Sequence, residues 1–340
     1  MPDSLLEVDD LHVEFRTDEG RVHAVNGISL AIAPGETLGI VGESGSGKSV
    51  TSLALLGLIP QPPGKVTRGS ARFRGRDLLK MRERELADIR GNRIAMIFQD
   101  PMTSLNPFLT IAEQLTEVTR LHLGYPRRKS LDHAVEMLEQ VGIPDPGRRI
   151  FEYPHQFSGG MRQRVMIAIA LSCKPDLLIA DEPTTALDVT IQAQILELIR
   201  SLQASYGAAV ILITHDLGVV AQVCDRVNVM YAGRFVEEAP VERLFADPRH
   251  PYTIGLLGSR PRIHGAAGRR LTPIAGQPPH LAHLDQGCAF RPRCAYAFER
   301  CAAETPPLVE IDVAGRAACF ADVRLGVPAT AIAPTGASRG

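Results

Sequence analysis

A glycine-rich run from Gly42 to Ser49, GESGSGKS, has the residue types and spacing needed to hold phosphate groups. It follows an apolar stretch at 38–41 and precedes a helix-forming stretch, which predicts a strand, a loop and a helix. Backbone N–H groups at the start of that helix can wrap phosphate oxygens. Lys48 is expected to neutralise β- and γ-phosphate oxygens, and the Ser49 hydroxyl to ligate Mg²⁺. The predicted phosphate-site residues are Gly42, Ser44, Gly45, Ser46, Gly47, Lys48, Ser49 and Val50.

A second acidic group is needed to hold the metal, and LLIADEP at 177–183 supplies it. Apolar residues carry Asp181 to the end of a buried strand, where its carboxylate can hold Mg²⁺ through water. Glu182 follows at once. On their own, two carboxylates after an apolar run are more typical of a strand end that meets solvent. Beside a phosphate loop, they favour a metal site.

Short apolar runs at 93–98, 176–181 and 209–216 predict the strands that position these residues. Such runs suit a sheet buried on both faces, and helical stretches between them predict parallel crossovers. Between 108 and 157 apolar residues recur at helical spacing, and Gly142 is expected to cap one helix. This block predicts a helical insertion in an α/β core.

Composition narrows the class of protein. The 340 residues carry 37 basic and 38 acidic side chains, a net charge of −1, so nothing favours nucleic acid as a partner. No apolar run approaches the roughly 18 residues of a membrane helix, and the acidic N-terminus does not resemble a signal peptide. We therefore expect a soluble, cytoplasmic chain, in which clustered cysteines are more typical of metal ligands than of disulfides.

Four further motifs resemble those of ATP-binding-cassette (ABC) ATPases, in that family's order over about residues 5–245. They are FQD at 98–100, FSGGMRQRV at 157–165, ALD at 186–188 and THD at 214–216. The resemblance implies a P-loop NTPase (RecA-like) α/β core with an antiparallel β subdomain and an inserted helical subdomain at about 100–157. It also implies ATP as the substrate, bound between two subunits that face each other head to tail.

The resemblance implies a role for each motif residue. Glu182 would be the general base, Gln99 would bind Mg²⁺ and sense water, and His215 would contact the γ-phosphate, with Lys48 completing the catalytic set. Mg²⁺ would lie among Ser49, Gln99 and Asp181. The opposite subunit would contribute Ser158, Gly159 and Gly160 to the γ-phosphate, and Asp188 would link the two sites.

Two departures from the family pattern stand out. Met161 replaces the usual glutamine of the signature and cannot offer an amide. The region expected to stack on adenine, 16–25, has no aromatic residue, which leaves Phe15 as the candidate.

Near the C-terminus, HPYTIGLLGSRP at 250–261, PIAGQPP at 273–279 and GCAFRPRC at 287–294 resemble the extension of oligopeptide and dipeptide importer ATPases. This implies a core at 1–248, an extension at 249–322 and a disordered tail at 323–340. The implied partners are a second ABC ATPase subunit in a heterodimer, two membrane permeases and, indirectly, an extracytoplasmic peptide-binding protein. The implied location is the cytoplasmic face of the inner membrane.

Four cysteines gather in that extension, at positions 288, 294, 301 and 319. Four thiolates can bind Zn²⁺ or an iron–sulfur cluster, and their spacing alone leaves zinc, iron–sulfur and unligated or paired thiols open. The importer resemblance implies a [4Fe–4S] cluster, acting as a structural staple, with redox sensing as the alternative. Cys173 and Cys224 are expected to be core residues.

Two alternative functions remain at this point. A nickel or glutathione importer would use the same type of subunit, because cargo is selected by other components. A soluble ABC ATPase acting on DNA is disfavoured by the balanced charge and by the lack of a long coiled-coil insertion.

Overall fold

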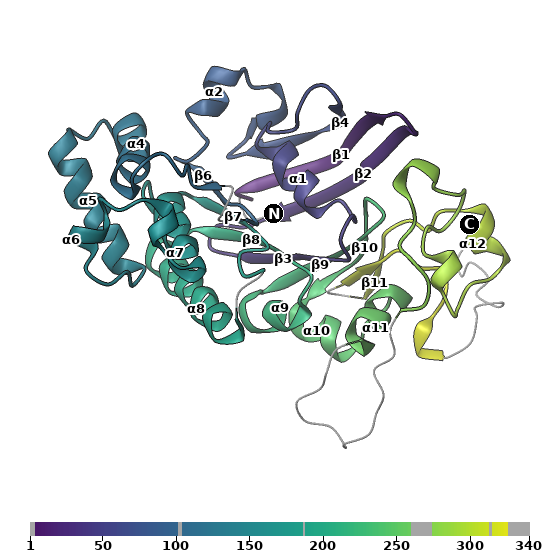
Figure 1. Ribbon diagram of the computed structural model, residues 1–340. Helices are drawn as coiled ribbons and strands as arrows, with labels where there is room; N and C mark the ends of the chain where they lie inside the picture. Colours follow the sequence, from purple (N-terminus) through teal and green to yellow (C-terminus); the bar gives the residue numbers. More distant parts are fainter. Residues whose placement is uncertain (1–3, 101–103, 186–187, 260–273, 313–314, 326–340) are drawn as a thin grey trace.

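A computed structural model describes residues 4–100, 104–185, 188–259, 274–312 and 315–325 of the chain. Two sheets and their covering helices form the core. Figure 1 shows the inserted helices at one end of the larger sheet and the C-terminal extension at the opposite end. No helix of the described ranges is long and apolar enough to cross a bilayer.

The larger sheet has the strand order β11-β12-β10-β9-β3-β8-β7-β6. Strands β6 to β9 pair with β3 and with one another in parallel, while β10, β11 and β12 are antiparallel. All residues of β3, β7 and β8 are buried, as expected for strands covered on both faces. The predicted apolar strands are confirmed. The bounds are β3 Thr37–Val41, β6 Ile94–Ile97, β7 Leu177–Asp181, β8 Ala209–Thr214, β9 Arg226–Tyr231, β10 Arg234–Pro240, β11 Val309–Asp312 and β12 Gly315–Ala317.

Helices pack on this sheet and carry several of the predicted motifs. Helix α1 begins directly after the glycine-rich loop, and α7 begins directly after Ser158. Apolar side chains of α7 and α8 form one core cluster with β6, β7, β8 and the inserted helices. The bounds are α1 Lys48–Leu55, α7 Gly159–Leu171, α8 Val189–Tyr206, α9 Leu217–Val223 and α10 Val241–Ala246.

The smaller sheet is antiparallel, with the order β2-β1-β4-β5, in agreement with the expected β subdomain. Its apolar face packs with α1 and the larger sheet in a second core cluster. The bounds are β1 Leu6–Thr17, β2 Gly20–Ile32, β4 Gly64–Phe73 and β5 Arg76–Asp77, followed by η1 Leu78–Lys80 and α2 Glu83–Ala87.

The insertion is helical, as predicted. It comprises α4 Ile111–Leu123, α5 Arg127–Gln140, α6 Pro146–Arg149 and the short turn η2 Pro154–Gln156. Gly142 follows α5 with φ 73°, and its N–H donates to the carbonyl of Glu139. The predicted glycine cap is therefore confirmed, since only glycine adopts this left-handed conformation at little cost.

The C-terminal extension continues the larger sheet, because β12 pairs with β10. Tyr252 and Phe290 anchor a third core cluster, against which Cys288 and Cys294 pack. The short helices are α11 Pro251–Gly258, η3 Leu281–His283, η4 Arg291–Arg293, α12 Glu299–Ala303 and η5 Val323–Leu325. The remainder of the expected tail, 326–340, lies outside the described residues.

Candidate functional site

The glycine-rich loop joins β3 to α1, the arrangement that its sequence predicts. Gly47 is the N-cap of α1 with φ 107°. A Cβ atom at Gly47 would lie 2.3 Å from the carbonyl oxygen of Ala24, and one at Gly42 would lie 2.2 Å from that of Met230. Glycine is therefore required at both positions, where neighbouring backbone closes in on the loop.

Lys48 is the first residue of α1 and its side chain is buried. Its ammonium donates to the carbonyl oxygens of Gly42 at 2.8 Å and Glu43 at 3.0 Å. Burial lowers the pKa of Lys48, and the carboxylates of Glu182 and Asp181 oppose that shift. An ammonium has three donors, so these two contacts leave one for a phosphate oxygen.

Asp181 is the last residue of β7, and its buried carboxylate lies beside the loop. Its Oδ1 accepts a hydrogen bond of 3.0 Å from the Ser49 hydroxyl. Burial raises the pKa of Asp181, and the bond from Ser49 partly opposes that effect. Oxygen ligands of this type are those that Mg²⁺ prefers, so this pair is the candidate magnesium site.

Glu182 is the meeting point of three side chains. Its Oε2 atom accepts hydrogen bonds from Gln99 at 3.1 Å and Thr185 at 2.8 Å, and lies 3.3 Å from Nδ1 of His215. The residue has φ 47°, a left-handed conformation that is uncommon outside glycine and recurs at functional sites. The structure thus brings together Gln99, Glu182 and His215, which the sequence placed far apart.

Thr185 was not among the expected residues. It lies in the run EPTT directly after the acidic pair, so its closeness to Glu182 in the chain was the available signal.

Ser158 lies elsewhere on the molecule. It is the exposed N-cap of α7, and its hydroxyl accepts a hydrogen bond of 3.3 Å from the Met161 amide. Gly159 is also exposed, with nothing within 4 Å of a Cβ built on it. Within the described residues, no hydrogen bond joins Ser158 to its own glycine-rich loop. This helix start therefore lies at the surface of the molecule.

Asp188 is the exposed N-cap of α8, and its side chain makes no capping bond. The two residues before it in the ALD motif, 186 and 187, lie outside the described residues. Phe15 pairs with Val22 and Gly64 in the smaller sheet, and its half-buried ring packs against the core.

The four clustered cysteines all lie in the extension, near enough for Cys319 to interact electrostatically with the other three. Burial raises the pKa of the Cys294 thiol to about 11 and that of Cys319 to about 12. Backbone N–H groups point at the sulfurs: Ala321 donates to Cys319 at 3.4 Å, and Phe290 to Cys288.

The two remaining cysteines lie outside the extension and are half-buried, and Cys224 packs against the apolar core. Burial raises the pKa of Cys173 to about 11 and that of Cys224 to about 12. Within the described ranges of the chain, one group brings its ligand atoms close enough together to hold a metal ion. The ligand atoms of Glu19, His280 and His283 lie within 4.8 Å of one another, and all three side chains are exposed.

Comparison with known families and proteins gives a consistent result. Residues 25–185 match the ABC transporter family, and residues 236–301 match the oligopeptide/dipeptide transporter C-terminal region. The chain is 54% identical to the oligopeptide transport ATP-binding protein OppD of Bacillus subtilis, over 90% of this chain and 86% of that protein. It is 53% identical to OppD of Salmonella typhimurium, over 94% of each.

Solved structures agree on the core. The ATP-binding cassette MJ0796, in a dimeric post-hydrolysis state bound to ADP and Pi, matches with a TM-score of 0.62 and 28% identity. The match covers 69% of this chain and 98% of that one. The structure of cbiO1 from Clostridium perfringens, part of the ABC transporter complex cbiONQ, matches with a TM-score of 0.60 and 28% identity, over 72% and 92%.

Proposed function

The chain belongs to the ABC transporter family, among the oligopeptide transport ATP-binding proteins, and from that premise we propose that it hydrolyses ATP to drive import of di- and oligopeptides. One observation carries the catalytic part of the proposal. Lys48, Ser49 and Asp181 lie beside a phosphate loop, and Glu182 next to them is contacted by Gln99 and His215.

The chemistry follows from these contacts. Lys48 and the loop amides bind the phosphates of ATP, while Glu182 takes a proton from the attacking water. Gln99 and His215 contact the Glu182 carboxylate, and both would face the γ-phosphate of bound ATP. Ser49, Gln99 and Asp181 would hold Mg²⁺, which when bound neutralises phosphate charge.

A complete site needs a second subunit. The exposed start of α7, with Ser158, Gly159 and Gly160, would donate to the γ-phosphate held by the facing loop. Asp188 would lie at the same interface. Hydrolysis removes the phosphate that bridges the two subunits, so the closed dimer opens. A second ABC ATPase subunit, forming a heterodimer, is the proposed partner.

The same premise extends to the membrane. We place the subunit on the cytoplasmic face of the inner membrane, bound to two permeases that receive peptide from an extracytoplasmic binding protein. The inserted helices at about 100–157 and the segment after Gln99 would transmit the motion. Residues 101–103 of that segment lie outside the described residues. The proposed division is a core at 1–248 and an extension at 249–322.

The extension is proposed to hold a [4Fe–4S] cluster through Cys288, Cys294, Cys301 and Cys319. Thiols whose pKa is raised by burial need a cation to ionise at neutral pH, and the amides directed at the sulfurs suit bound thiolates. Zinc is the alternative. A bound cluster would supply folding energy to this region.

Uptake assays test the cargo. A strain lacking this subunit should lose import of di- and oligopeptides and keep import of nickel and glutathione, and the plasmid-borne gene should restore it. Loss of nickel or glutathione uptake alone would reassign the cargo. Recovery of the subunit with DNA in a salt-sensitive complex, and without integral-membrane permeases, would overturn the transport function.

A further inference from the structure

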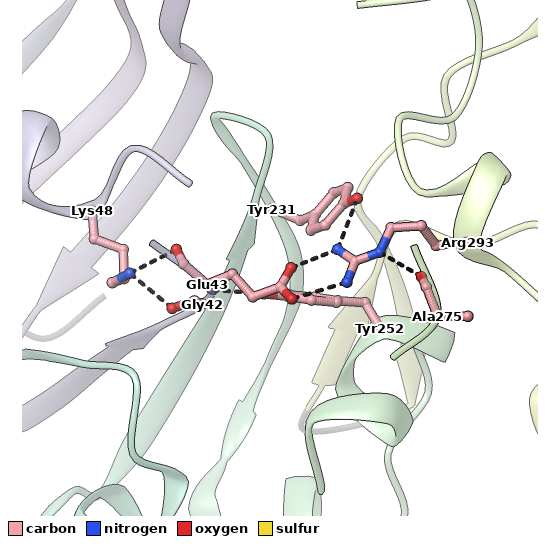
Figure 2. Close-up of polar contacts among 7 residues, drawn as sticks. All are labelled: Gly42, Glu43, Lys48, Tyr231, Tyr252, Ala275 and Arg293. Carbon is pink, nitrogen blue, oxygen red and sulfur yellow. Dashed lines mark hydrogen bonds and ion pairs between the residues drawn. The ribbon is translucent and has the colours of Figure 1, made fainter. Parts of the chain in front are cut away.

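The C-terminal extension contacts the phosphate loop at Glu43, the second residue of that loop. Arg293 donates to both carboxylate oxygens of Glu43, from Nη1 to Oε2 at 2.6 Å and from Nη2 to Oε1 at 2.9 Å (Figure 2). The Arg293 side chain is only 4% exposed. Such a paired, largely buried contact is far stronger and more directional than a surface ion pair.

The orientation of Arg293 is fixed by its other contacts. Its Nε donates to the carbonyl of Ala275 at 3.0 Å, and Nη1 also reaches the Tyr231 hydroxyl at 3.4 Å. The guanidinium carbon lies 5.9 Å from the ring centres of Tyr231 and of Phe290. A lysine could supply the charge but not this planar, two-pronged geometry.

The same residue of the loop is held at its backbone. The Glu43 amide donates to the hydroxyl of Tyr252 at 2.7 Å, and Tyr252 is fully buried in α11. The Glu43 carbonyl accepts from the Lys48 ammonium. A continuous chain of polar contacts thus runs from Arg293 through Glu43 to Lys48, the residue proposed to bind phosphate (Figure 2).

At its other end, this series of polar contacts reaches the clustered cysteines. Arg293 directly precedes Cys294, and backbone hydrogen bonds hold both ends of the segment between Cys288 and Cys294. The Cys288 amide donates to the Cys301 carbonyl at 2.8 Å, and the Cys294 amide to the Arg291 carbonyl at 3.2 Å. Arg293 thus belongs to a short segment that begins and ends at two of the four clustered cysteines.

We infer that Arg293 is a positioning residue for the phosphate loop, through which the four-cysteine site controls the affinity for ATP. The inference rests on the proposed function, because it assumes that ATP binds at this loop. Ordered cysteines hold Arg293 on Glu43, and Glu43 holds the loop and Lys48 in the shape that fits the phosphates. A disordered cysteine segment releases Glu43 and weakens nucleotide binding.

The test compares two arginines of one short helix in the full-length chain. Arg293→Ala is expected to weaken binding of a non-hydrolysable ATP analogue with Mg²⁺ by about tenfold or more, because the loop loses its alignment. Arg291→Ala removes the same charge from η4, but the ion pair of Arg291 among the described residues is with the exposed Asp285, at 3.3 Å, and not with the phosphate loop, so its affinity should match wild type. Arg293→Lys should lie between them.

A second comparison separates positioning from a loss of folding. In a Glu43→Ala chain, adding Arg293→Ala should have no further effect on affinity, because the contact is already gone. Hydrogen exchange should rise at the amides of residues 43–47 in Arg293→Ala and stay unchanged in Arg291→Ala. Equal losses in both arginine variants, or additive losses with Glu43→Ala, would overturn the inference.

The link to the cysteines is tested in the same way. Cys294→Ser should weaken nucleotide binding in the wild-type chain and have no further effect in Arg293→Ala, whereas Cys173→Ser should have no effect in either. Additive effects of Cys294→Ser and Arg293→Ala on nucleotide affinity would show that the cysteine site does not act through Arg293.

Wild-type protein that fails to bind the analogue, or that binds it equally well as Lys48→Ala, would instead reject the proposed function. Wild-type binding that is abolished by Lys48→Ala but unaffected by Arg293→Ala would reject only the positioning role.

Discussion

The Ser49 hydroxyl donates a 3.0 Å hydrogen bond to Oδ1 of Asp181, which joins the first turn of α1 to the end of β7. The two residues are 132 positions apart in the chain. This bond brings a hydroxyl and a buried carboxylate to the same side of the phosphate loop, where both can serve one cation.

Ser49→Ala removes the hydroxyl and should raise the Mg²⁺ concentration needed for half-maximal ATP hydrolysis by about tenfold or more, as losses at metal sites commonly do. Ser49→Thr keeps the hydroxyl and should leave that concentration nearly unchanged. The measurement is ATPase rate against Mg²⁺ at saturating ATP. An alanine variant with the wild-type Mg²⁺ dependence would remove Ser49 from the metal site.

Glu182→Gln should bind ATP almost as tightly as wild type but lower the hydrolysis rate by about a hundredfold or more, since a general base contributes that much. Glutamine keeps the contacts with Thr185 and Gln99 within reach but cannot accept the proton of the attacking water. Rapid-quench measurement of phosphate release checks the hydrolysis rate, and filter binding checks the affinity for ATP. The stalled chain should accumulate as an ATP-bound dimer.

The control for this variant is Glu197→Gln, which removes a carboxylate from an exposed position of α8 and should leave turnover unchanged. Near-normal turnover in Glu182→Gln would exclude Glu182 as the base.

The strands and the phosphate loop could be predicted because their signals are local. The run LLIA before Asp181 is apolar over its whole length. In GESGSGKS, Gly42 and Gly47 stand where the backbone leaves no room for a side chain. The meeting of Gln99, Glu182 and His215 was expected only from the family resemblance. It arises because β6, β7 and β8 are neighbours, so residues that follow them share one edge.

The contact between Glu43 and Arg293 spans 250 positions and leaves no periodic trace in the sequence. Arg293 lies in a segment without apolar periodicity, where its two-pronged contact depends on the fold of both partners. The pairing of β12 with β10 was missed for the same reason, since β12 is a strand of only three residues. Long-range pairs of this kind depend on tertiary packing, which single-sequence patterns do not encode.

Ser158 has two separable roles, and substitutions at this position can distinguish them. Ser158→Ala loses the helix cap, at about 1 kcal/mol of stability, as well as the donor proposed for the partner's γ-phosphate. Ser158→Asp should keep the cap and the stability, because aspartate caps helices as well as serine does, but its carboxylate offers no hydrogen-bond donor. Both should bind ATP as single subunits and hydrolyse it slowly.

Calorimetric unfolding and ATPase assays of both variants check this prediction. Wild-type turnover in Ser158→Asp would mean that the hydroxyl serves only the cap.

The cysteine site predicts a defined metal content. Anaerobically purified protein should contain about four iron and four sulfide per chain, and Cys301→Ser, at the most buried of the four positions, should lose them. Cys173→Ser is the matched control and should retain them. Elemental analysis and visible spectra decide the matter, and stoichiometric zinc without iron or sulfide would reject the cluster.

His250 should make stability depend on pH between about 3 and 6.5. It is buried at the N-cap of α11, where Nδ1 accepts a hydrogen bond of 3.1 Å from the Tyr252 amide, and burial lowers its pKa from 6.5 to about 3. In that window the unfolded chain binds a proton that the folded chain excludes. The contribution of His250 is thus complete above pH 6.5 and falls by about 1.4 kcal/mol per pH unit on acidification.

His250→Asn keeps a capping acceptor but does not titrate. The difference in unfolding free energy between the two proteins therefore isolates the protonation of His250 from that of other acid-sensitive groups. One of these is Glu237, whose carboxylate accepts a hydrogen bond from the His250 amide at 2.8 Å. Between pH 6.5 and about 5, denaturant unfolding should show wild type losing about 2 kcal/mol relative to the variant. The Tyr252 hydroxyl accepts a hydrogen bond from the Glu43 amide. The same acidification should therefore also loosen the phosphate loop in wild type but not in the variant. Parallel stability curves for the two proteins would mean that His250 binds a proton as readily in the folded chain as in the unfolded chain.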